Sequence, residues 1–199
     1  MPINATIRKV PAPLAAAFIE KWHYSARCPT GKNIFFGWFV PGDGDLFGET
    51  LYAVADYGIG VNPYQAKFLS NTTGHDVENG VLLELKRLCR IEPKNEGLPL
   101  TSFISKCHKK LKKEGYRFIV SFSDPTYGHD GGIYRAANFK NIGKTNAETH
   151  AVEEDGTVRH RRLYFRYARR NGVDVATARK ELGLTLVKTA PKDRWLICL

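Results

Sequence analysis

The feature that most constrains the fold is a short apolar segment that ends abruptly in polar, turn-forming residues. The segment 116–122, YRFIVSF, is rich in aromatic and β-branched residues, which predicts a buried strand. It is followed by Ser123, Asp124 and Pro125, where the chain must turn. Ligands of open α/β sheets bind outside the carboxyl ends of the strands, so we expect a functional site at this elbow.

The polar and aromatic side chains after this strand are expected to line one cleft. They are Ser123, Asp124, Pro125, Tyr127, His129, Asp130 and Tyr134. A simpler alternative is that Asp124 only caps a helix and that 124–128 is a surface turn.

Hydrophobic periodicity and turn residues divide the rest of the chain into alternating strands and helices. The expected strands are 5–10, 35–40, 51–58, 81–91, 140–145 and one ending in 195–199, and the expected helices are 14–22, 100–111, 134–138 and 176–182. The polar segment 61–80 predicts a long loop over one face of the domain, of the kind that often forms a lid.

The chain carries an excess of positive charge, with 30 Lys and Arg against 20 Asp and Glu, a net charge of +10. This excess favours a polyanionic partner. It is concentrated in 159–170, RHRRLYFRYARR, and we expect a hairpin that turns at Asp155 and Gly156 to present this run. Guanidinium groups bind phosphates and aromatic rings stack on bases, so this run predicts nucleic-acid contact; a solvated edge strand is the plainer reading. The arginines are Arg159, Arg161, Arg162, Arg166, Arg169 and Arg170.

Several classes of protein are disfavoured by the remaining composition. No apolar run approaches the ~20 residues of a membrane span. The four cysteines lack CxxC spacing, so we expect reduced thiols in a cytoplasmic protein rather than a zinc site or disulfides.

The order of elements resembles the GNAT acyltransferases, whose short helix with Asn and Tyr before a Phe and a Gly is matched by GGIYRAANFKNIGKT. The resemblance implies an α/β (α+β) fold with a central, mixed, mostly antiparallel twisted sheet flanked by helices. It implies a single domain, 1–199, with the basic hairpin and tail from about 150 to 199 as a DNA-contacting extension. The pyrophosphate loop of an acyl-CoA site is represented only by Gly97, with the helix-start amides of Thr101 and Ser102 and with Asn138 as further donor-binding candidates.

A closer resemblance is to the phage Mom family. It rests on KWHYS, ELKRL, the elbow SFSDPTYGHDGG, DGTVRHRR and KDRW. The family resemblance implies conversion of adenine in double-stranded DNA to an N6-carbamoylmethyl derivative, in the host cytoplasm, which protects phage DNA because altered N6 groups spoil the major-groove pattern that nucleases read. A homodimer would suit the symmetry of DNA.

The residues of the elbow agree with an adenine target. SDPTY has the layout of the DPPY motif of N6-adenine methyltransferases, so Asp124 is expected to accept the amine hydrogens and Tyr127 to stack on an extruded base. Ser123, Pro125 and His129 complete the expected substrate set. Two alternatives remain open: an N6-adenine methyltransferase, which lacks its Gly-rich strand end here, and a non-catalytic DNA-binding or anti-restriction protein.

The family resemblance also implies an essential set, namely His23, Tyr24, Arg87, Asp124 and Tyr134. Tyr134 matches the GNAT general acid, and Arg87, in a strand, needs an anionic partner such as a cofactor phosphate or Asp124. A histidine at a helix end is commonly a packed or dipole-stabilising group, whereas in this family His23 is also a candidate iron ligand. The implied donor is an acyl-CoA that rearranges, a related activated group, or an aminoacyl-tRNA.

Overall fold

The computed structural model describes residues 5–46, 48–92, 98–159 and 161–199. These residues form two compact units, each of which is described by itself. The first, here the sheet unit, comprises Met1–Ser123, Gly131–Gly143 and Arg194–Leu199. The second, here the small unit, comprises Asp124–Asp130 and Lys144–Asp193.

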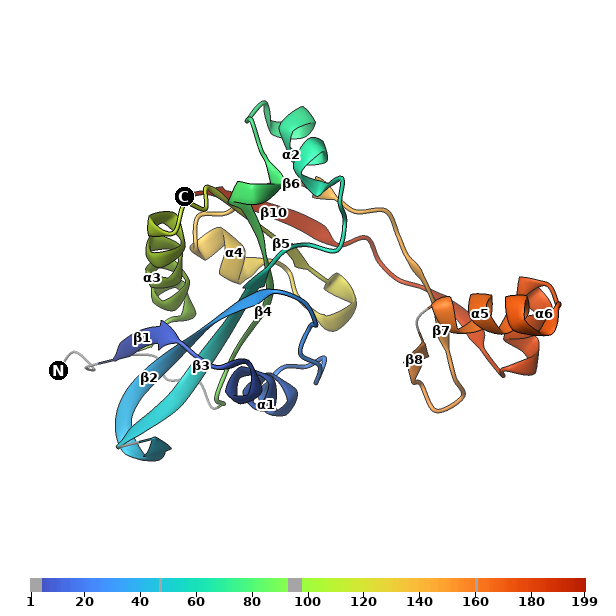
Figure 1. Cartoon of the computed structure of the whole chain (residues 1–199), viewed down its shortest axis with the longest axis horizontal. Coiled ribbons are helices and arrows are strands. Elements are labelled where there is room, and N and C mark those ends of the chain that lie inside the picture. The colour runs from blue at the N-terminus through green and yellow to red at the C-terminus, as the bar shows by residue number, and fades with distance from the viewer. Residues whose placement is uncertain (1–4, 47, 93–97, 160) are drawn as a thin grey trace. The chain divides into compact units, whose positions relative to one another are not determined.

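A seven-stranded sheet forms the centre of the sheet unit (Figure 1), in the order β1-β2-β3-β4-β5-β10-β6. Neighbours from β1 to β4 pair antiparallel, whereas β4 and β5 pair parallel. The strands are β1 (Thr6–Lys9), β2 (Asn33–Leu46), β3 (Glu49–Gly58), β4 (Leu82–Arg90), β5 (Phe118–Ser123), β6 (Lys140–Lys144) and β10 (Asp193–Cys198). The predicted strands are confirmed, and so is the mixed, mostly antiparallel sheet.

Helices cover both faces of this sheet because its strands alternate apolar side chains between two cores. Helix α1 (Ala12–Trp22) packs Phe18 and Ile19 against one face, and α3 (Leu100–Lys113) packs Phe103 and Leu111 against the other. Two short elements complete the described helices before the elbow, α2 (Gln65–Thr73) and the 3-10 turn η1 (Asn79–Val81). The short helix α4 (Gly132–Ala136) lies beyond it.

The prediction of a long loop at 61–80 is wrong, because α2 occupies the centre of this segment. Ala66 and Leu69 are buried against Leu82 and Val120 of the sheet, so a narrow apolar face holds a helix whose other faces carry Asn and Thr. The composition of α2 is polar overall and therefore suggested a loop, but the burial of the apolar side chains Ala66 and Leu69 stabilises the helix.

The parallel pairing of β4 with β5 is short and ends where the site begins. It joins Leu82 to Phe118, Leu83 to Ile119 and Glu84 to Val120. On its other edge β4 carries a register shift, since Asp56 pairs with Arg87 and Tyr57 with Leu85, which leaves Lys86 as an extra residue. Such a bulge redirects the neighbouring side chains.

The small unit has its own three-stranded sheet and apolar core. Its elements are η2 (Pro125–Tyr127), β7 (Thr149–Val152), β8 (Val158–Arg159), α5 (Arg162–Asn171), α6 (Val175–Glu181) and β9 (Thr185–Lys188), and its core consists of Ala151, Tyr164, Ala168, Ala178 and Leu184. The predicted turn is confirmed, because the Thr157 N–H donates to Asp155 Oδ1 at 2.8 Å. Strand β9 was not predicted.

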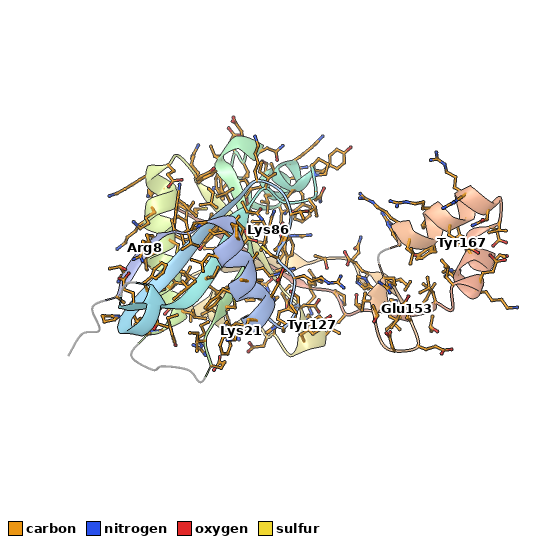
Figure 2. The ribbon with its side chains drawn as sticks, turned by 60° about the horizontal axis from the view of Figure 1, so that its bottom comes forward. Arg8, Lys21, Lys86, Tyr127, Glu153 and Tyr167 are labelled. Atoms are coloured by element: carbon orange, nitrogen blue, oxygen red, sulfur yellow. The ribbon has the colours of Figure 1, made fainter. Side chains whose placement is uncertain are left out.

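The expectation that the hairpin presents the arginine run is corrected. Only Arg159 lies on the hairpin, where it pairs with Glu153 (2.7 Å), whereas the run continues in α5. Tyr164 and Ala168, four residues apart, are buried and thereby fix the helix. Figure 2 labels Glu153 on the hairpin side and Tyr167 on α5.

Candidate functional site

Tyr134 lies at the point where β4 and β5 part. A hydrogen bond of 2.9 Å joins its Oη to Ser121 Oγ, and Ser121 Oγ in turn donates to the Leu85 carbonyl (2.8 Å) across the two strands. Burial raises the pKa of Tyr134 above its ordinary value of 10.0. The phenol therefore keeps its proton at neutral pH, as a general acid must.

Aromatic packing fixes the ring of Tyr134. It stacks on Trp195 (centroids 5.7 Å apart) and meets the edge of Phe139 (5.4 Å). Trp195 Nε1 donates to Ser123 Oγ at 2.9 Å, so the last residue of β5 holds β10 in place. Gly131 has φ +77 and faces the Trp195 ring, where a Cβ would clash. Gly131, the residue before α4, is thus required by the packing of Trp195, the ring that stacks on Tyr134.

A buried acid lies on the α1 face of the sheet. Asp56 of β3 is fully buried, and neither carboxylate oxygen has a hydrogen-bond partner among the described residues. Burial raises its pKa to about 7, against the opposing effects of Lys86 and Arg87. Lys86, labelled in Figure 2, also donates to Asn33 Oδ1 at 3.0 Å. The carboxylate near Arg87 in the sheet unit is therefore Asp56, which sequence reasoning missed.

This acid makes stability depend on pH in a defined direction. The pKa of Asp56 is about 7 when folded and 3.8 without the fold, so the folded state binds the proton more tightly and loses stability as pH rises between these values. We expect Asp56→Asn to remove that loss, gaining up to about 1.4 kcal/mol for each pH unit from about 4 to 7 relative to wild type. Urea unfolding of both proteins from pH 4 to 8 measures the difference.

The matched control for this measurement is Asp174→Asn. Asp174 caps α6 through the N–H groups of Ala176 and Thr177, and these bonds lower its pKa. Its replacement should cost stability above pH 4, the opposite sign. A difference between Asp56→Asn and wild type that does not change with pH would contradict the assigned titration.

His23 and Tyr24 follow the end of α1, as expected. The His23 Nδ1 accepts the Ser25 N–H (3.1 Å) and lies 2.9 Å from Ser25 Oγ, while its ring packs on Tyr24 at 4.3 Å. Tyr24 is 53% exposed and, together with Arg87, influences the pKa of Tyr134. Tyr24, Arg87 and Tyr134, three of the expected essential residues, thus share one region.

The arginine of β4 is held by backbone oxygens. Arg87 Nε donates to the Arg27 carbonyl (3.2 Å) and Nη1 to the Lys86 carbonyl (2.7 Å). These bonds tie the segment after α1 to the bulged strand. Arg87 therefore helps to hold the segment around Arg27 against β4 as well as contributing charge.

A cavity of about 550 Å³ lies between α3, the end of α4 and the last residues of β10. Three of the four predicted donor-binding residues line it, namely Thr101, Ser102 and Asn138; Gly97 lies outside the described residues. Asn138 has φ +64, a conformation that asparagine tolerates better than most residues.

The chemistry of this cavity suits an anionic donor. Lys106, Lys109 and Lys112 line it along α3. His108 also lines it, and its Nε2 is buried without a hydrogen-bond partner among the described residues; burial lowers its pKa to about 4, so it is neutral. Lysines and helix-start amides bind phosphates, and a neutral imidazole offers a hydrogen bond to an uncharged group.

The elbow residues Asp124–Asp130 belong to the small unit. Asp124 is buried (8% exposed); its Oδ1 accepts the Thr126 N–H (3.0 Å) and its Oδ2 lies 3.3 Å from Lys192 Nζ. Hydrogen bonds from Thr126 and the charge of Lys192 hold its pKa low despite burial. Asp124 therefore caps the 3-10 turn η2, as the simpler alternative expected. Contact of Asp124 with adenine remains a prediction. Tyr127 is 56% exposed, as a stacking residue requires; the roles of Pro125 and His129 also stay predictions.

Helix α5 presents a basic face opposite its buried residues. Arg162, Phe165, Arg166, Arg169 and Arg170 are exposed. Phe165 is 52% exposed among these cations. Guanidinium groups around an exposed ring match the needs of a nucleic-acid backbone and its bases.

Iron has no evident place in this arrangement. Among the residues that the structure describes, no group of three or more His, Cys, Asp or Glu side chains is placed to hold a metal ion. The Nδ1 of the candidate ligand His23 is engaged by Ser25. In the same described part of the chain, no helix is long and apolar enough to cross a membrane.

Solved structures with the same arrangement of elements define the fold class. An Arabidopsis thaliana NAA60 complex with a bisubstrate analogue has a TM-score of 0.52 at 8% identity, covering 98% of this chain and 99% of that one. The ribosomal-protein-S18-alanine N-acetyltransferase from Escherichia coli gives 0.51 at 9% (98% and 93% covered), and an N-acetyltransferase from Staphylococcus aureus Mu50 gives 0.51 at 12% (98% and 98%). The chain thus has the GNAT acetyltransferase fold, as predicted.

The family follows from the sequence match. A model of the Mom protein family matches residues 4–194, and the chain belongs to that family. No match is found among curated proteins. Family and fold together support a group-transfer function.

Proposed function

We propose that this protein transfers a small activated group to the N6 amine of adenine in double-stranded DNA, leaving a carbamoylmethyl group that protects phage DNA from restriction. The observation that carries the proposal is the protonated Tyr134 of α4, hydrogen-bonded to Ser121 where β4 and β5 separate, together with the lysine-lined cavity between α3 and the end of α4. Membership of the Mom family supports the choice of target.

The residues of the sheet unit account for donor binding. Lys106, Lys109 and Lys112 would neutralise phosphates, and the amide of Thr101 would add a hydrogen bond at the start of α3. The Ser102 N–H already donates to the Pro99 carbonyl (2.9 Å), so Ser102 would contribute through its side chain. An acyl-CoA or related thioester, when bound, would supply an acyl carbon with a thiolate leaving group. Attack by the N6 amine would form the C–N bond as the C–S bond breaks and give an N-acyl adenine, which for a glycyl group has the same atoms as the carbamoylmethyl derivative and would reach it by rearrangement. Tyr134 donates its proton to that leaving group, and Ser121 holds the phenol in position.

The small unit accounts for DNA binding in the same proposal. The arginines of α5 contact phosphates, and Phe165 is available to pack on a sugar or base. Because phosphate contacts carry no sequence information directly, this helix positions the enzyme on DNA without choosing a sequence.

Mass spectrometry of deoxynucleosides from bacteria that express the chain is the direct test. We expect a new deoxyadenosine derivative with the mass of an added carbamoylmethyl group, absent from cells with an empty vector. A methyl increment would replace the proposal by N6-adenine methylation. Unmodified DNA, together with tight and strongly salt-dependent binding, would replace it by a non-catalytic DNA-binding function.

A further inference from the structure

A second cavity of the sheet unit lies apart from the donor cavity. It encloses about 270 Å³ between the segment after β3, the start of α2, and strands β4 and β5. Its walls include Ile59, Val61, Gln65, Leu82, Glu84 and Val120. Pockets for drug-sized ligands span about 300 to 1,000 Å³, so this one suits a smaller molecule of the size of one ring system.

Gln65 is the unusual member of this wall. Its side chain is buried (6% exposed), and its Nε2 has no hydrogen-bond partner among the described residues. Its backbone N–H is already satisfied by the Asn62 carbonyl (3.1 Å), so the side chain is not needed to begin the helix. A buried amide donor without a partner calls for an explanation, and a ligand that binds there supplies one.

Glu84 supplies the complementary acceptor and connects the cavity to the reaction site. It pairs with Val120 at the last position where β4 and β5 are joined, and the next residues, Leu85 and Ser121, contact each other and hold Tyr134. The charge of Glu84 contributes to the raised pKa of Tyr134. The cavity therefore shares strands β4 and β5 with the hydrogen-bonded residues that hold Tyr134.

The two faces of the sheet separate this cavity from the donor cavity. Leu82 and Val120 belong to the apolar cluster beneath α2, whereas Leu83, Leu85 and Ile119 belong to the cluster beneath α3. Two ligands can thus approach the opening between β4 and β5 from opposite faces. This is the geometry that a transfer between two bound molecules needs.

The polar groups of the cavity match the amino edge of adenine. That edge presents the N6 amine as donor beside N1 as acceptor, and the cavity presents a carboxylate acceptor and an amide donor between apolar walls. Guanine and thymine present an acceptor where adenine has its amine. Ile59 and Val61, 62% and 95% exposed at the cavity, offer apolar surface to a base that has left its stack.

We propose that this cavity receives the target adenine, with Gln65 Nε2 donating to N1 and Glu84 accepting from the N6 amine. The identity of the base rests on the proposed function. The assignment differs from the sequence-based one, in which Asp124 holds the amine, because Asp124 is occupied by Thr126 and Lys192.

The test measures binding of deoxyadenosine monophosphate to the whole chain in the absence of a donor. We expect the side-chain NH₂ signals of Gln65 to shift in nuclear magnetic resonance spectra, and Gln65→Leu to weaken binding about tenfold through the lost hydrogen bond. Asn71→Leu, the same kind of change on an exposed position of α2, should bind as wild type does. Unchanged binding by Gln65→Leu would overturn the proposal.

Other nucleotides separate the remaining explanations. Deoxyguanosine monophosphate should not shift the Gln65 signals, and equal shifts with deoxycytidine monophosphate would overturn the choice of adenine. Shifts caused by coenzyme A instead would assign the cavity to the adenine of a donor and overturn its role in target binding. Gln65→Glu, which keeps the size of the side chain but removes the donor, serves if the leucine variant does not fold.

Failure of this inference differs from failure of the proposed function. Suppose that cells with wild-type protein contain modified adenine but that adenine binding does not depend on Gln65. This result would contradict only the cavity assignment. Adenine binding that depends on Gln65, in cells whose DNA stays unmodified, would sink the reaction and leave the cavity as an adenine site.

Discussion

Tyr134→Phe is expected to lower the yield of modified adenine by about 10²- to 10⁴-fold, the range that a positioned general acid contributes. The substitution removes only the hydroxyl group, which is joined to Ser121 Oγ at 2.9 Å. The ring keeps its contacts with Trp195 and Phe139, so the fold should persist. The measurement is the rate of adenine modification in vivo, followed by mass spectrometry at matched protein levels.

Tyr116→Phe is the matched control. Tyr116 packs against the same apolar cluster as Tyr134, and the same deletion of a hydroxyl there should leave modification unchanged. Thermal unfolding of both variants separates chemistry from stability. Modification by Tyr134→Phe within about threefold of wild type, when general-acid catalysis would supply at least about a hundredfold, would exclude the phenol as the acid.

Ser121→Ala distinguishes positioning from chemistry at the same site. Ser121 donates to the Leu85 carbonyl and contacts Tyr134, so its loss frees the phenol without removing its proton. We expect a smaller loss of activity than for Tyr134→Phe. A combined variant should be no worse than Tyr134→Phe alone, because both changes act through one hydroxyl.

The sequence was informative wherever local pattern and burial agree. The strand that ends at Ser123 and the helix with Phe103 and Leu111 were predicted because each carries a continuous apolar pattern. Two residues of the donor cavity were predicted from a local pattern too, because Thr101 and Ser102 lie at the start of a predicted helix. Local patterns therefore located the elements that frame the site.

The residues that were missed depend on contacts between distant segments. In the sequence, Asp56 is a single polar residue within an apolar strand. It is buried because α1 and the segment after it pack on that face of the sheet, which no local pattern reveals. Gln65 was assigned to a loop because α2 has only two buried apolar side chains, Ala66 and Leu69, too few for a recognisable helical pattern. The helical state of the arginine run was missed for a similar reason. Tyr164 and Ala168 are buried by the core of the small unit, which the local sequence does not indicate.

Replacing Arg166, Arg169 and Arg170 by glutamine is expected to weaken DNA binding by about two orders of magnitude at 0.15 M salt. All three are exposed on α5. Each phosphate contact that is lost removes about 0.9 from the slope of log affinity against log salt, so the triple variant should lose about 2.7. Titration of a duplex at several salt concentrations measures both quantities.

Lys106, Lys109 and Lys112 provide a control of equal charge. Their replacement by glutamine lowers the net charge of +10 by the same three units but changes the donor cavity of the sheet unit. If α5 is the DNA-binding surface, the lysine variant keeps its salt slope and loses affinity for coenzyme A, whereas the arginine variant shows the reverse. Equal losses of DNA affinity in the two variants would mean that total charge, rather than this helix, holds the DNA, because long-range attraction depends on net charge while counterion release depends on the contacts made.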